Sequence, residues 1–71
     1  MDAEKCVFLL GEYTKTLSEY AINQGMYVKA RVACKLGWEE ACDEIEKWER
    51  KASESRERLK ELFEELEREC F

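Results

Sequence analysis

Hydrophobic residues recur three and four positions apart along almost the whole chain, which is the spacing of one face of an α-helix. In the first third they are Ala3, Cys6, Leu10, Tyr13, Leu17, Tyr20 and Ala21. In the middle third they are Tyr27, Ala30, Cys34, Trp38, Ala41, Ile45 and Trp48. In the last third they are Leu59, Leu62, Phe63, Leu66 and Cys70. Because β-branched residues are sparse and do not alternate with polar ones, the pattern predicts an all-α protein.

Two short segments predict turns. "NQG" at residues 23–25 ends in a glycine, which can adopt the left-handed conformation found after many helices. "KASES" at residues 51–55 places Ser53 where it can cap a following helix. We therefore expect one domain, residues 1–71, folded as an antiparallel up-down-up three-helix bundle. Its helices are predicted over about residues 2–23, 26–50 and 53–70.

The same periodicity also continues through "KASES", from Trp38 to Leu66, and this leaves a second interpretation open. A single helix from residue 26 to residue 70 would form a coiled coil with another chain. Periodicity alone does not choose between the two interpretations.

The four cysteines favour the bundle. In an antiparallel helix pair, facing residues lie equally far from the turn. Cys6 and Cys42 lie equally far from residue 24, and Cys34 and Cys70 lie equally far from residue 52, so both midpoints fall in the expected turns. We therefore predict two inter-helix disulfides, Cys6 with Cys42 and Cys34 with Cys70. Free thiols packed as small apolar side chains are the alternative.

Enzymatic and metal chemistry find little support in the sequence. Cys34 and Cys42 are about 12 Å apart along a helix at about 1.5 Å per residue, whereas zinc holds each sulfur at about 2.3 Å. The chain has no histidine to act as the base of a catalytic thiol. It also has no Gly-rich phosphate loop. We expect no enzyme activity, no catalytic, cofactor-binding or metal-binding residue, no cofactor and no small-molecule substrate.

Charge restricts the partners. The net charge is −5, and 41% of the residues are charged. An acidic chain without a basic stripe is a poor ligand for nucleic acid or for anionic membranes. The longest apolar run, residues 6–10, is too short to span a bilayer, and the N-terminus does not resemble a secretory signal. The sequence leaves the localisation open, although disulfides would require an oxidising environment.

Glycines and tryptophans occur within the predicted helices. Gly11 and Gly37 lie equally far from the first expected turn, so they are predicted to face one another and let the first two helices approach closely. Trp38 and Trp48 fall on the inner face of the second helix and are expected in the core.

A few apolar residues do not fit the predicted inner faces. Val28, Val32 and Leu36 follow one another at intervals of four and project away from the inner face of the second helix, and Phe8 and Ile22 lie off the inner face of the first. Exposed apolar stripes often mark interaction surfaces. We predict that these residues contact a protein partner or a second copy of the chain, with the third helix as a support.

The last third, "SRERLKELFEELEREC", resembles de novo designed, disulfide-stapled three-helix miniproteins in its ideal helix formers and interleaved charges. "GMYVKA" at residues 25–30 is similar to the turn-and-helix of microtubule-interacting-and-transport domains and tetratricopeptide repeats. Those are peptide-binding helical modules. The resemblances imply an engineered or designed helical binder. The alternative is a structural scaffold or a self-associating assembly subunit without an external partner.

Overall fold

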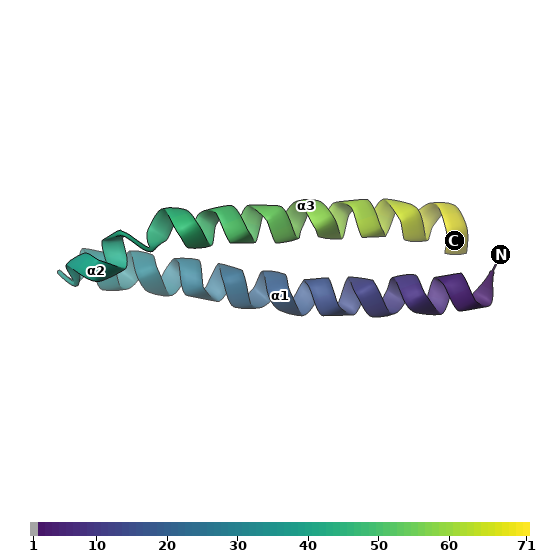
Figure 1. Ribbon diagram of the computed structural model, residues 1–71, viewed down its shortest axis with the longest axis horizontal. Coiled ribbons are helices and arrows are strands. Elements are labelled where there is room, and N and C mark those ends of the chain that lie inside the picture. Colours follow the sequence, from purple (N-terminus) through teal and green to yellow (C-terminus); the bar gives the residue numbers. More distant parts are fainter. Residues whose placement is uncertain (1) are drawn as a thin grey trace.

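The computed structural model describes residues 2–71 and consists of two long antiparallel helices. Helix α1 spans Ala3–Lys35, α3 spans Ile45–Cys70, and the short α2, Glu39–Cys42, lies in the connection between them. Figure 1 shows α1 and α3 side by side, with both termini at the same end. The hairpin measures 53 × 14 × 13 Å. The all-α prediction is confirmed, but over these residues two long helices take the place of the predicted three-helix bundle.

The two long helices meet along a repeating seam. On α1 its residues are Cys6, Leu9, Tyr13, Thr16, Tyr20, Asn23, Tyr27, Ala30 and Cys34. On α3 they are Ile45, Trp48, Ala52, Ser55, Leu59, Leu62, Leu66 and Glu69. All of them are buried or half-buried, and they follow one another in steps of three and four. This is the heptad spacing of a coiled coil, here closed within one chain.

The largest buried side chains lie near the termini. Leu9, Leu62 and Leu66 form a core there, and Tyr13 and Cys70 pack against it. Leu62 is only 1% exposed. The core is short compared with the 53 Å length of the hairpin. Small proteins with little buried apolar surface commonly depend on cross-links for stability.

Small and polar residues line the middle of the seam, and they explain why both expected turns are wrong. Asn23 Nδ2 donates to Ser55 Oγ at 2.8 Å, and Ser55 Oγ donates to the Lys51 carbonyl at 3.0 Å. Ala52, beside them, is buried. "NQG" therefore lies within α1 and "KASES" within α3, because Asn23, Ala52 and Ser55 pack between the two helices rather than ending either of them.

The chain reverses instead immediately after α1. Gly37 has a φ of +99°, a conformation that favours glycine. Its N–H donates to the Cys34 carbonyl, and the Trp38 N–H donates to the Ala33 carbonyl, both at 3.0 Å. These two bonds form the Schellman motif that ends many helices. Gly37 thus terminates α1, and the prediction that it faces Gly11 across a helix contact is wrong. The same break excludes a single helix from residue 26 to residue 70.

Two disulfides are present, as predicted, but both predicted pairings are wrong. Cys6 is bonded to Cys70, not to Cys42, and their Cα atoms are 5.8 Å apart. Cys34 is bonded to Cys42, not to Cys70, with Cα atoms 4.7 Å apart. The two bridges span 64 and 8 residues and share one midpoint, Trp38. A single turn at that position therefore accounts for both, where the prediction required two turns.

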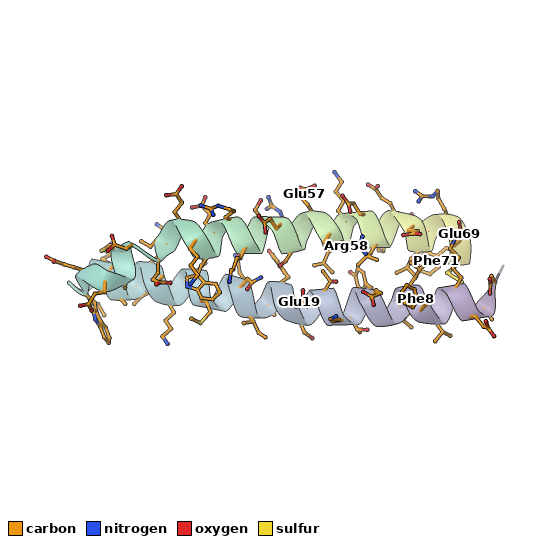
Figure 2. The ribbon with its side chains drawn as sticks, in the orientation of Figure 1. Phe8, Glu19, Glu57, Arg58, Glu69 and Phe71 are labelled. Atoms are coloured by element: carbon orange, nitrogen blue, oxygen red, sulfur yellow. A yellow bond between two sulfur atoms is a disulfide. The ribbon has the colours of Figure 1, made fainter. Side chains whose placement is uncertain are left out.

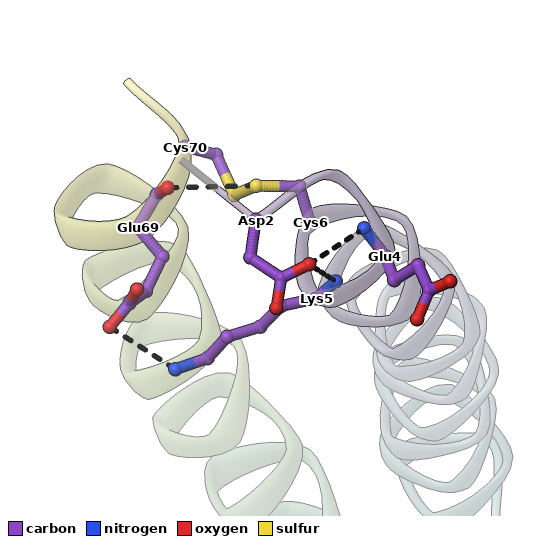
Figure 3. Close-up of a disulfide and its surroundings, with 6 residues drawn as sticks. All are labelled: Asp2, Glu4, Lys5, Cys6, Glu69 and Cys70. Carbon is purple, nitrogen blue, oxygen red and sulfur yellow. Dashed lines mark hydrogen bonds and ion pairs between the residues drawn. A yellow bond between two sulfur atoms is a disulfide. The ribbon is translucent and has the colours of Figure 1, made fainter.

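The disulfide between Cys6 and Cys70 closes the open end of the hairpin (Figure 3). Lys5 Nζ lies 3.2 Å from Glu69 Oε1 across the same end. Asp2 caps α1, because its carboxylate accepts hydrogen bonds from two backbone N–H groups of the first turn, the nearer at 3.0 Å. The covalent bond and the ion pair hold the first turn of α1 against the last turn of α3, and the cap stabilises the start of α1 itself.

Candidate interaction surface

Helix α1 carries a second stripe of uncharged residues, on the side opposite the seam. The stripe also advances in steps of three and four, through Val7, Gly11, Thr14, Ser18, Ala21, Gly25, Val28 and Val32. Larger apolar side chains flank it: Phe8, Leu10, Leu17, Ile22 and Leu36. All of these residues are exposed. We call the two sets together the back face of α1.

The residues predicted to contact a partner all belong to the back face. Their exposed fractions are 66% for Phe8, 64% for Ile22, 51% for Val28, 53% for Val32 and 82% for Leu36. The sequence prediction divided them between two helices. In the structure they lie on α1 and its C-terminal cap, because α1 continues through residues 23–25. One unbroken helix thus joins two separate groups of apolar residues into a single surface.

Four other apolar members of the back face do not follow from the sequence prediction. Leu10, Leu17 and Ala21 are expected on an inner face, yet Leu10 and Leu17 are 57% and 45% exposed, and Ala21 is exposed as well. Val7, which is 71% exposed, is not identified at all. The three-helix prediction gives the first helix a wide inner face that includes Leu10, Leu17 and Ala21. The regular spacing from Val7 to Val32 is the signal that identifies Val7 and Ala21, and Leu10 and Leu17 flank that stripe.

The hydroxyl groups of the back face are hydrogen-bonded within α1. Thr14 Oγ1 donates to the Leu10 carbonyl at 2.7 Å, and Ser18 Oγ donates to the Thr14 carbonyl at 3.2 Å. Bonds of this kind to the preceding turn satisfy the side-chain donor. A partner can therefore cover this side of α1 without leaving an unpaired hydroxyl group, which would cost about 1–3 kcal/mol.

Helix α3 is charged on its outer side, in contrast to the apolar back face of α1. Glu57 points away from α1 in Figure 2, and Arg58 Nη1 lies 3.6 Å from Glu61 Oε2 along the same helix. Phe63 is 45% exposed, but its ring centroid lies 6.4 Å from that of Tyr13 on α1. Its apolar surface therefore belongs to the contact between the two helices. The extended exposed apolar surface is on α1.

A smaller apolar hollow lies at the turn end of the hairpin, with a volume of about 330 Å³. Its apolar lining comes from Met26, Ala30, Ala33, Trp38, Ala41 and Trp48. Trp38 is 66% exposed, and its Nε1 donates to Glu40 Oε2 at 2.8 Å, so the expectation that it lies in the core is wrong. Trp48 is half-buried, with the ammonium groups of Lys47 and Lys51 5.0 and 4.8 Å from its ring centroid.

Among residues 2–71, no helix combines the length and the apolar character needed to cross a membrane. Within the same part of the chain, no three Asp, Glu, Cys or His side chains converge as a metal site requires. A scan against models of protein families found no match, and neither did searches of curated proteins and of solved structures. The function is therefore inferred from the geometry of the hairpin.

Proposed function

We propose that the protein is a non-enzymatic interaction module that binds a protein partner through the back face of α1. One observation supports the proposal most directly: α1 is apolar on two opposite sides, and α3 covers only one of them. A helix that is apolar all round is normally buried, and large exposed apolar patches mark interaction sites. In this proposal α3, with its charged outer side, holds α1 in place and does not contact the partner.

The back face fits recognition through a helical surface. Val28, Val32 and Leu36 follow one another at intervals of four, the spacing of anchors that one helix presents to an apolar groove or to another helix. Valine has a single strongly preferred rotamer in a helix, so little side-chain freedom is lost on binding. The disulfide between Cys34 and Cys42 fixes the end of α1 beside these anchors.

A scaffold without a partner is the second candidate. It is favoured by the two disulfides, which hold both ends of a hairpin whose core is short. In a scaffold the exposed apolar residues would have no role, and replacing them would affect solubility alone.

Photo-cross-linking distinguishes the two candidates. A photoreactive residue replaces Val32 on the back face or, as the matched control, Glu57 on the outer side of α3, and each variant is irradiated in the cells that express it. Circular dichroism first establishes that both variants are folded. We expect discrete cross-linked products from position 32 and none from position 57. Equal products from both positions, or no product from either, would contradict the interaction module and favour the scaffold.

A further inference from the structure

The positions of the back-face stripe are spaced symmetrically about the middle of α1. Extended by one charged residue at each end, its positions pair about a midpoint between residues 19 and 20, close to the middle of α1. The pairs are Glu4 with Lys35, Val7 with Val32, Gly11 with Val28, Thr14 with Gly25, and Ser18 with Ala21. Facing positions of two antiparallel, heptad-spaced helices are related in this way.

We propose that the back face of α1 binds a second copy of this chain, with the two α1 helices antiparallel and a two-fold axis between Ser18 and Ala21. The contact is isologous, so it closes a dimer and leaves no open surface for a chain of copies. Each α1 is then covered on both sides, by its own α3 and by the α1 of the other copy. The inference identifies the partner of the proposed interaction module and rests on that proposed function.

The two glycines within α1 support a close contact with a second helix. A Cβ atom built at Gly11 or at Gly25 meets no atom within 4 Å, so the hairpin itself does not require glycine at either position. Each glycine costs about 1 kcal/mol relative to alanine in a helix. In the antiparallel pairing Gly11 faces Val28, and Gly25 faces Thr14. In both pairs a residue without a side chain thus meets a branched residue, so the backbones of the two α1 helices can approach each other.

The two ends of the back-face stripe carry opposite charges. Glu4 precedes Val7 by three residues and Lys35 follows Val32 by three, and both are exposed. An antiparallel pair places Glu4 of one copy against Lys35 of the other, and a parallel pair places each of them against its own copy. Complementary charge of this kind favours one orientation over the other.

A dimer through the back face needs nearly the whole length of α1. Its 33 residues extend about 50 Å at about 1.5 Å per residue. A helix is about 10 Å wide, so contact along all of α1 covers about 500 Å² on each copy and about 1,000 Å² in total, which is the lower limit for a specific interface. An alignment centred near residue 19 uses this length, whereas a steep crossing of the two helices does not.

Sedimentation equilibrium over a concentration series tests the dimer. We expect the wild-type protein to approach twice the mass of one chain. Ala21→Glu places a carboxylate at the closest approach of the two helices, where its burial without a partner should weaken association by about 100-fold or more. Ser53→Asp adds one negative charge at an exposed position on α3 and should leave association unchanged. Both variants should keep the wild-type circular dichroism, because Ala21 is exposed in the hairpin.

Charge reversal tests the orientation. Glu4→Lys and Lys35→Glu should each weaken the antiparallel dimer, by about three- to tenfold given the modest strength of exposed ion pairs and the two symmetric copies of each pair. The double variant should recover the wild-type dissociation constant. In a parallel dimer each residue faces its own copy, so the double variant would not recover it, and the proposed arrangement would be overturned.

The remaining outcomes separate this inference from the proposed function. If the protein stays monomeric and position 32 cross-links to a different protein, the partner is not a second copy of the chain, and the proposed interaction module is retained. A monomer without any cross-linked product overturns both. A dimer that Ala21→Glu does not weaken uses another surface and overturns the inference. A monomer that binds phosphatidylcholine–phosphatidylserine vesicles, and loses this binding with Val32→Asp, replaces the protein partner with a membrane.

Discussion

Glycine has one role at the end of α1 and a different role within it. Gly37 has a φ of +99° and ends α1, whereas Gly11 and Gly25 lie within the helix with open space where a Cβ would be. Glycine is required by backbone conformation at the first position only. At the other two it lowers the stability of the isolated hairpin, and contact with a second helix is the reason that the proposed dimer offers for it.

Alanine substitutions at these glycines should therefore have opposite effects. In dilute solution Gly11→Ala or Gly25→Ala should raise the thermal midpoint by about 4–8 °C, since each gains about 1 kcal/mol of helix stability. Gly37→Ala should lower the midpoint, because its left-handed conformation costs a non-glycine residue about 1–2 kcal/mol. Circular dichroism melts measure both. A lower midpoint for Gly11→Ala would mean that this position packs closely inside the chain, contrary to the structure.

The same glycine substitutions should weaken association between copies. A methyl group at position 11 or 25 meets a branched residue of the second α1, so the dissociation constant should rise while the dilute melt improves. Sedimentation equilibrium on the same samples provides the comparison. Stronger association of Gly25→Ala would show that the two helices do not approach at this point.

For helices and turns, the sequence predicts the helical class and five exposed residues of the back face, but it does not predict the connections. "NQG" and "KASES" contain Asn, Gly and Ser, which are favoured in turns and are equally suited to places where two helices approach closely. Local composition does not distinguish these two situations. In the structure Asn23 and Ser55 are hydrogen-bonded to each other across the seam, which no local signal specifies.

The cysteine spacing is itself consistent with the observed disulfide pairing. A turn at Trp38 places Cys6 level with Cys70 and Cys34 level with Cys42, so a single reversal satisfies both bridges. The predicted pairing also satisfied antiparallel geometry, and it agreed with two local turn signals. The glycine immediately before Trp38 was the competing signal. The three-helix interpretation places this glycine in a helix interior, because the apolar spacing continues across it.

The two disulfides should contribute unequally to stability. In the chain-entropy model, bridges that span 64 and 8 residues stabilise the folded state by about 4 and about 2.5 kcal/mol. The double variant Cys6→Ser/Cys70→Ser should therefore lose more stability than Cys34→Ser/Cys42→Ser. Urea unfolding of the two double variants measures the difference. An equal or reversed order would contradict loop closure as the main source of stabilisation.

The two outer sides of the molecule differ in polarity. Its charged outer side on α3 and its apolar back face on α1 lie on opposite sides of a hairpin 14 × 13 Å in cross-section, so the core between them is a single seam. Side chains on the back face therefore do not contribute to the core, although they are apolar. This separation allows stability and association to be changed independently.

Two substitutions should demonstrate that separation. Leu62, 1% exposed, lies in the core, and Leu62→Ala should cost about 2–5 kcal/mol. Val32 is 53% exposed, and Val32→Asp should cost less than about 1 kcal/mol in dilute solution, mostly because its charge lies near the C-terminus of α1. Val32→Asp should nevertheless abolish association. If Val32→Asp unfolds the protein, the back face belongs to the core, and the proposed function loses its main support.

All of these inferences depend on α1 being one unbroken helix with α3 on one side. The disulfide pairing tests this most directly, because a turn at residues 23–25 and a turn at Trp38 require different bridges. Trypsin digestion without reductant, followed by mass spectrometry, should find residues 6–15 linked to 69–71, and residues 32–35 linked to 36–47. Residues 6–15 linked to 36–47, with 32–35 linked to 69–71, would indicate the three-helix bundle and contradict the hairpin.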